Sequence, residues 1–174
     1  MAEKITINGV NYTRYYRVTV CGTMPYQTSV KVDAWTIATE RPSGRHIEHG
    51  FDVEYSYWKT FDELIHDGDR DLLSEAIQQR TKSDDYFHAL RDDKTYENLY
   101  FRVTSADKYP DSIDGAVLSE TRPSDCVRDG YFGELSDSFK TLFEVMEQHP
   151  ELLPSAIYVH DNFRPEAVGE ALPF

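Results

Sequence analysis

The side chains best spaced for acid–base or metal chemistry are Asp84, His88 and Asp92, which follow one another at intervals of four residues. On a helix this spacing places all three on one face, where a carboxylate could orient the imidazole as a general base or the three could bind a metal. A helix start stabilised by Asp84 and a solvated His88 explain the same pattern, and the neighbouring sequence offers no nucleophile or oxyanion hole. We therefore expect no catalytic residue here. A small hydrolase or transferase with this His and Asp site is the alternative.

Other metal and cofactor signals are incomplete. His46 and His49 are three residues apart, which on a strand sends them to opposite faces. The Asp spacing at 67, 69 and 71 fits the first half of a calcium loop, but Leu72 and Gln78 stand where that loop needs Gly and Glu. Phosphate-binding glycine loops, a G-x-S-x-G elbow and C-x-x-C pairs are missing from the sequence. We expect neither a metal nor a cofactor.

Charge is the strongest chemical signal in the chain. The 174 residues contain 18 Lys and Arg against 31 Asp and Glu, a net charge of −13. Residues 1–50 hold 6 basic and 4 acidic residues, or +2, whereas residues 51–174 hold 12 and 27, or −15. A magnitude of about 2 to 8 is enough to keep a small domain soluble. The excess suggests a partner with a basic surface.

Acidic pairs with aromatic residues between them could form the surface that binds this partner. Carboxylates on one face of a strand repeat every roughly 6.6 Å, close to the spacing of phosphates along a nucleic-acid strand. Interleaved aromatic rings would add contact anchors. The partner-binding residues that we predict are Asp52, Glu54, Asp62, Glu63, Asp84, Asp85, Asp92 and Asp93, with Tyr86 and Trp58 as anchors.

In size, acidity and lack of catalytic motifs, the chain resembles the small acidic inhibitors that viruses and mobile elements use against restriction or CRISPR complexes, some of which mimic DNA. The resemblance is one of composition and rests on no aligned motif. It implies a non-enzymatic inhibitor that occupies the nucleic-acid-binding surface of a basic partner in a prokaryotic cytoplasm. An immunity or adaptor protein that neutralises a basic toxin is a second interaction role. Direct nucleic-acid binding is not expected at a charge of −13.

The first part of the chain predicts an antiparallel sheet of about four to six strands. Strands are expected at 4–7, 12–20 and 29–39, with Asn8 and Gly9 as a hairpin turn. Strict alternation from Ile47 to Tyr57 predicts one further strand, with Asp52 and Glu54 on its wet face. The 40% hydrophobic content excludes a disordered acidic tail.

A central helical segment follows over residues 60–93. Thr60 and Glu63 form a capping box for the first helix, and apolar residues at 72–77 predict a second, capped by Asp69 or Asp71. A third, shorter helix is predicted at 83–90 with Ser83 as its cap.

Residues 94–174 predict mixed structure. We expect a strand at 95–104, a long loop at 105–133 with at most a short strand at 116–119, and an amphipathic helix from Ser136 to Pro150 that packs on the sheet. A short strand at 156–160 and a helical turn at 165–172 would end the chain. The prediction is one α+β domain over residues 1–174, without an internal repeat or a membrane-spanning segment, and with a homodimer as an open option.

Overall fold

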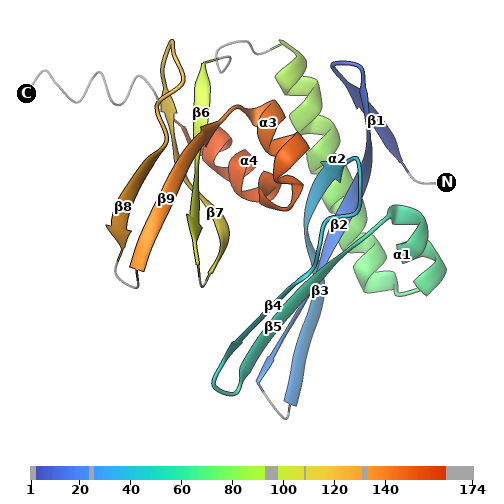
Figure 1. Ribbon diagram of the computed structural model, residues 1–174. Helices are drawn as coiled ribbons and strands as arrows, with labels where there is room; N and C mark the ends of the chain where they lie inside the picture. The colour runs from blue at the N-terminus through green and yellow to red at the C-terminus, as the bar shows by residue number, and fades with distance from the viewer. Residues whose placement is uncertain (1–2, 24–25, 93–97, 108, 131–132, 164–174) are drawn as a thin grey trace, which may run out of the picture. The chain divides into compact units, whose positions relative to one another are not determined.

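The computed structural model describes residues 3–23, 26–92, 98–107, 109–130 and 133–163, and it has an α+β fold (Figure 1). Antiparallel sheets are combined with helices, including one at the C-terminal end of the described chain, which confirms the predicted class. The chain divides into two compact units, Met1–Asp92 (unit 1) and Asp93–Phe174 (unit 2). The expectation of one domain over residues 1–174 stays a prediction.

Unit 1 is built on a five-stranded antiparallel sheet. Its strands are β1 (Lys4–Ile7), β2 (Val10–Thr23), β3 (Tyr26–Ala38), β4 (Arg45–His49) and β5 (Asp52–Lys59). Strand β2 pairs with β1 and β5 on one side and with β3 on the other, and β4 completes the sheet beside β5. The predicted turn between β1 and β2 is present, with φ of +52° at Asn8 and +81° at Gly9.

The single strand predicted from Ile47 to Tyr57 is wrong, because these residues form the β4–β5 hairpin. Gly50 has φ +63°, and His49 pairs with Asp52 across a two-residue turn. A turn of this length leaves the alternation in the sequence unbroken but reverses which residues share a face. Ile47 therefore lies opposite Glu54 and not on the face of Tyr55.

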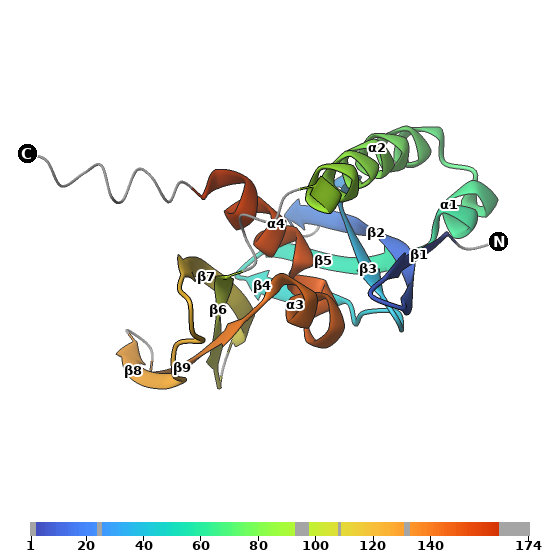
Figure 2. The same cartoon turned by 90° about the horizontal axis from the view of Figure 1, so that it is seen from above.

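Two helices follow the sheet. Helix α1 (Phe61–Asp67) begins at Thr60 with the predicted capping box, and α2 (Arg70–Asp92) begins after Asp69, whose carboxylate accepts hydrogen bonds from two backbone N–H groups of the first turn. Helix α2 is continuous, so the predicted break at Ser83 is wrong. Ser83 is fully buried within the helix, and packing has overridden its preference for a helix start. In Figure 2, α2 runs across one face of the sheet of unit 1.

Unit 2 has a four-stranded antiparallel sheet in the order β7-β6-β9-β8. Its strands are β6 (Leu99–Ala106), β7 (Tyr109–Leu118), β8 (Cys126–Gly130) and β9 (Gly133–Lys140). Helix α3 (Leu142–Gln148), the 3₁₀ helix η1 (Pro150–Leu152) and helix α4 (Leu153–Asn162) follow the sheet. The buried side chains of this unit include those of Leu99, Phe101, Val103, Val145, Met146 and Leu153.

The predictions for the elements of unit 2 need three corrections. The segment 105–133, predicted as a loop, contains β7 and β8. Strand β8 is an exposed edge strand, so its sequence lacks the apolar alternation that predicts a strand. The helix predicted from Ser136 begins at Leu142, after a second capping box at Thr141, and Ser136 lies in β9. Residues 156–160 belong to α4 and not to a strand. The predicted helical turn at 165–172 lies outside the described residues.

Apart from the additional strand β1 of unit 1, the two sheets have the same topology and the same register. In both, a first hairpin (β2–β3 or β6–β7) is followed by a second hairpin (β4–β5 or β8–β9), whose last strand pairs with the first strand of the earlier hairpin. Tyr16 pairs with Lys59 in unit 1, and Phe101 pairs with Lys140 in unit 2. A register shift interrupts β2–β3 at Arg17 and β6–β7 at the corresponding place.

The sequences of the two units repeat along with the topology. Tyr15, Arg17, Val18 and Thr19 recur 85 positions later in β6. Residues 30–66 align with residues 111–147 without a gap, at an offset of 81, and 8 of the 37 pairs are identical. These identical pairs are Asp33/Asp114, Arg41/Arg122, Pro42/Pro123, Ser43/Ser124, Phe51/Phe132, Lys59/Lys140, Thr60/Thr141 and Glu63/Glu144.

The prediction that the chain has no internal repeat is therefore wrong. The identical residues are scattered among many differences, and the change of offset from 85 to 81 breaks the alignment between the first two strands of each sheet. The shared register of the strands makes the repeat evident. One chain thus holds two versions of the same fold, so residues at equivalent positions can be compared directly.

Candidate functional site

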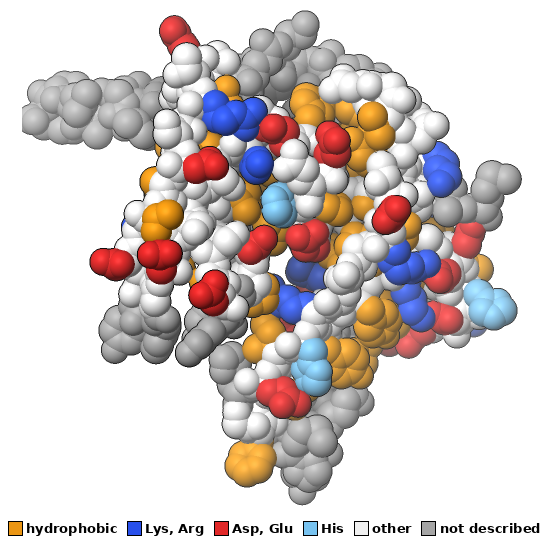
Figure 3. All heavy atoms as spheres, viewed as in Figure 1, with side chains coloured by type: hydrophobic (Ala, Val, Ile, Leu, Met, Phe, Trp, Pro, Cys, Tyr) orange, Lys and Arg blue, Asp and Glu red, His pale blue; other side chains and the backbone are white. Residues whose placement is uncertain are grey.

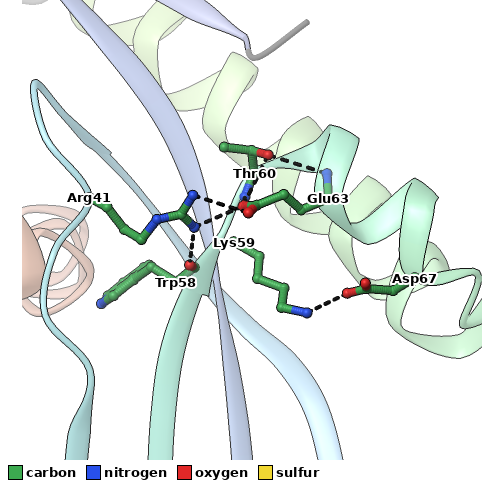
Figure 4. A network of polar contacts seen from close by, with 6 residues as sticks. All are labelled: Arg41, Trp58, Lys59, Thr60, Glu63 and Asp67. Carbon is green, nitrogen blue, oxygen red and sulfur yellow. Dashed lines mark hydrogen bonds and ion pairs between the residues drawn. The ribbon is translucent and has the colours of Figure 1, made fainter.

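An arginine ties a loop, a strand end and a helix start together in unit 1 (Figure 4). Arg41 donates from Nη1 to the carbonyl oxygen of Trp58 at 2.6 Å and to Oε1 of Glu63 at 2.8 Å. Its Nη2 donates to Oε2 of Glu63 at 3.1 Å. The same carboxylate accepts from the backbone N–H of Thr60 at 2.8 Å and so completes the capping box. We call this arrangement the arginine clasp.

The clasp fixes the charge state of its carboxylate. The hydrogen bonds from Arg41 lower the pKa of Glu63, against the opposing effect of burial, and the backbone N–H of Thr60 lowers it further. The hydrogen bond to Glu63 correspondingly raises the pKa of Arg41. Glu63 therefore serves the start of α1, and its charge is neutralised within unit 1.

Unit 2 repeats the clasp at the equivalent residues. Arg122 donates from Nη1 to the carbonyl oxygen of Phe139 at 2.6 Å and to Oε1 of Glu144 at 2.7 Å. Burial would raise the pKa of Glu144, but the hydrogen bonds from Arg122 and from the backbone of Thr141 outweigh it and hold the pKa below its usual value. In both clasps the guanidinium lies over a tyrosine ring, at 5.3 Å from the ring centre of Tyr15 or Tyr100.

A second polar cluster joins β2 to α2. Arg14 is buried and donates to Oε2 of Glu3 at 3.1 Å and to Oδ1 of Asp84 at 2.7 Å. The hydroxyl of Tyr16 donates to Oε1 of Glu3 at 2.7 Å, and burial together with this hydrogen bond raises the pKa of Tyr16. Burial would lower the pKa of Arg14, but its hydrogen-bonding and charged neighbours raise it. Asp84 thus balances a buried cation.

Four of the predicted partner-binding residues have structural roles. Glu63 and Asp84 form the ion pairs described above. Trp58 is only 4% exposed and packs against Tyr15 and Ala38, so it cannot act as a contact anchor on the surface. The ring of Tyr86 lies 5.9 Å from that of Trp35 and helps to hold α2 on the sheet.

The other predicted residues are distributed over unit 1. Asp52, Glu54 and Asp85 are exposed, and Asp62 is half-buried. Asp52 and Glu54 lie on β5, whereas Asp85 lies on α2. The side chain of Asp92 and the whole of Asp93 lie outside the described residues. The described acids of this set thus belong to three elements, β5, α1 and α2.

The alternative site around His88 lies on α2, with Asp84 and His88 four residues apart on one face of the helix. His88 is exposed on α2, and Arg14 binds the carboxylate of Asp84. Within the described part of the chain, no group of three or more His, Cys, Asp or Glu side chains is arranged to hold a metal ion. None of the described helices combines the length and apolar character needed to cross a membrane.

Two arginines of unit 2 form ion pairs with carboxylates of the same sheet. Arg128 donates to Oδ2 of Asp137 at 2.7 Å and to Oδ2 of Asp114 at 2.9 Å, and Arg102 pairs with the same Asp114 at 3.3 Å. Burial would raise the pKa of Asp137, but hydrogen bonds from Arg128 and from Thr104 keep it below its usual value. With Arg122 in the clasp, every arginine described in unit 2 is in an ion pair.

Many acidic side chains of unit 2 have no such partner. Figure 3 shows acidic side chains over β8 and β9. Exposed carboxylates without an ion pair among the described residues of this unit belong to Asp107, Glu120, Asp125, Asp129, Glu134 and Glu147. By sequence, unit 2 holds 7 basic and 16 acidic residues, or −9, against 11 and 15, or −4, in unit 1.

The β8–β9 hairpin brings two of these carboxylates together. Asp129 pairs directly with Glu134 across the strands. Like charges at such a position destabilise a sheet, since their Cβ atoms are about 5 Å apart. The equivalent pair in unit 1 is Glu48 with Val53, so the fold itself does not require two acids here.

These residues were absent from the sequence prediction because segment 105–133 was expected to be a loop. The signal that could have found them is the internal repeat, which aligns Asp129 and Glu134 with Glu48 and Val53 of the strand predicted from Ile47 to Tyr57. No protein-family model matches the chain, and comparisons with curated proteins and with solved structures gave no significant match.

Proposed function

We propose that the protein is a non-enzymatic binding protein whose unit 2 occupies the basic, nucleic-acid-binding surface of a partner protein. The observation that supports this role most directly is the division of charge in unit 2. Its described arginines are neutralised by ion pairs within the unit, whereas six exposed carboxylates have no ion pair there. The field of this surface is therefore negative, and a basic groove is its natural complement.

The cost of this charge also supports a binding role. A net charge of −9 on unit 2 alone slightly exceeds the magnitude of about 2 to 8 that solubility requires of a whole small domain. The Asp129 and Glu134 pair adds local repulsion that the homologous hairpin of unit 1 avoids. In this role the protein competes with nucleic acid, as acidic inhibitors of CRISPR or restriction complexes do.

The proposal can be tested by elution from duplex DNA cellulose. Proteins from an extract of the native host are bound to the column, and the full-length protein is applied at constant ionic strength. We expect the wild-type protein to elute a basic nucleic-acid-binding protein, identified by mass spectrometry. The variant Asp125→Asn/Asp129→Asn/Glu134→Gln should need at least about tenfold more protein for the same elution, because close charge pairs across interfaces are worth several kcal/mol together.

A control variant removes the same number of charges from unit 1. Asp52→Asn/Glu54→Gln/Asp85→Asn alters three exposed acids of that unit and should elute like the wild type. Loss of elution with this control but not with the unit 2 variant would place the binding surface in unit 1. If both variants elute like the wild type, or the wild type elutes nothing, the proposed function is wrong.

A further inference from the structure

On one face, the two sheets carry side chains of different polarity at equivalent positions. In unit 1, strand pairing places Val30, Val20, Tyr55 and His46 in one row across β3, β2, β5 and β4. The ring of Tyr57 stacks on that of Tyr55 with 6.4 Å between their centres. Val30 and Tyr55 are 41% and 42% exposed. We call Val30, Tyr55 and Tyr57 the Tyr55 face.

Unit 2 shows that the fold does not need apolar residues at these positions. Val30, Tyr55 and Tyr57 correspond to Asp111, Ser136 and Ser138. Nearer to the helices, by contrast, both copies keep apolar residues, with Val18 and Val32 matched by Val103 and Ile113. The apolar side chains of the Tyr55 face therefore add exposed apolar surface without being required for folding, which is typical of an interaction site.

The hairpin that carries this face ends in another exposed apolar side chain. Phe51 lies in the β4–β5 turn and is 77% exposed, the highest value among the exposed large hydrophobic residues of the described chain. Aromatic side chains of this kind are the usual anchors of protein interfaces. Phe51 thus extends the apolar surface to the tip of the hairpin.

The charged side chains beside the Tyr55 face indicate which kind of partner it can bind. A chain of net charge −13 repels a second copy of itself over most of its surface. At the Tyr55 face, however, both signs are present, because Glu48 lies on the same face as Tyr55 and the ammonium of Lys59, which also pairs with Asp67, lies 5.5 Å from the ring centre of Tyr57. An apolar centre with margins of both signs can be self-complementary, as a two-fold interface requires.

We propose that the Tyr55 face is the interface of a homodimer formed with a second copy of this chain. The proposal is independent of the acidic surface of unit 2. Because isologous interfaces use the same patch on both subunits, each substitution on the Tyr55 face acts twice in the dimer. The dimer would present two copies of unit 2 to a partner.

Sedimentation equilibrium of the full-length protein, from about 1 to about 100 µM, tests the proposal because a homodimer depends on protomer concentration. The variant Val30→Asp/Tyr55→Ser carries the residues that unit 2 has at the equivalent positions, so the fold tolerates them. We expect a dimer for the wild type and a dissociation constant raised at least about tenfold for the variant, as for anchor residues at interfaces. Far-ultraviolet circular dichroism should be unchanged.

Two further variants make the result specific. Phe51→Ser alters a side chain in a turn and should also weaken the dimer, whereas Tyr158→Ser removes an aromatic ring of 70% exposure on α4 and should not. A wild-type protein that stays monomeric at the highest concentration overturns the proposal. Dimers of undiminished stability in both the double variant and Phe51→Ser also overturn it. Elution from DNA cellulose by the wild-type protein is a separate measurement, so either proposal can fail while the other stands.

Discussion

At the scale of single residues, the main distinction is between carboxylates that hold the fold together and carboxylates that face outward. Glu63, Glu144 and Asp84 each neutralise an arginine of their own unit. Asp129 and Glu134 instead face each other across a hairpin. Composition counts all of these residues alike, which is why the sequence prediction mixed structural acids with exposed ones.

Asp84 and its neighbour Asp85 provide a direct comparison. Asp84→Asn should lower the free energy of unfolding by about 1 kcal/mol, because buried Arg14 loses a charged partner whose own exposure limits the effect. Asp85→Asn should stay within about 0.5 kcal/mol of the wild type, as is usual for exposed sites. Urea unfolding of both variants measures this, and equal effects would contradict the role given to Asp84.

Glu144 should make stability depend on pH in the acid range. Its pKa is lowered in the folded state, so its contribution is complete above the unfolded pKa of about 4.3 and disappears as the pH falls through the folded value. Glu144→Gln should therefore reduce the loss of unfolding free energy between about pH 5 and pH 2. Urea unfolding at a series of pH values measures the slope. An identical pH profile in the variant would show that the clasp carboxylate does not contribute.

At the scale of elements, the sequence predicted the parts of the fold with strong local signals. The capping box at Thr60, the turn at Asn8 and Gly9 and the cap at Asp69 are present. The predictions failed where tertiary contacts dominate. Ser83 resembles a helix cap but is packed inside α2, and the exposed strand β8 has no apolar alternation to reveal it.

The effect of Ser83→Ala on the free energy of unfolding distinguishes a serine buried inside α2 from a serine that caps a helix. Its hydroxyl is buried without a hydrogen-bond partner in the described structure. Ser83→Ala should therefore raise the free energy of unfolding by about 0.5 to 1 kcal/mol, since alanine removes an unsatisfied group and favours a helix. A helix cap at Ser83 would instead make the same substitution cost about 1 kcal/mol. Thermal or urea unfolding decides between a gain and a loss.

At the scale of the whole molecule, the two units share one fold but expose different side chains. Residues of the arginine clasp are the same in both, because each helix start needs them. The exposed faces have diverged, with an apolar Tyr55 face in unit 1 and a strongly acidic hairpin in unit 2. The change in net charge near residue 50 of the sequence falls within unit 1, so it does not mark the boundary between the two units.

The most direct test of the central claim is a competition for the partner recovered from DNA cellulose. Labelled duplex DNA and the full-length protein are offered together to that partner, and the complexes are separated by native electrophoresis at several salt concentrations. The account predicts mutually exclusive binding, with the protein's affinity falling steeply as salt rises. A ternary complex of partner, DNA and protein, or an affinity insensitive to salt, would contradict it.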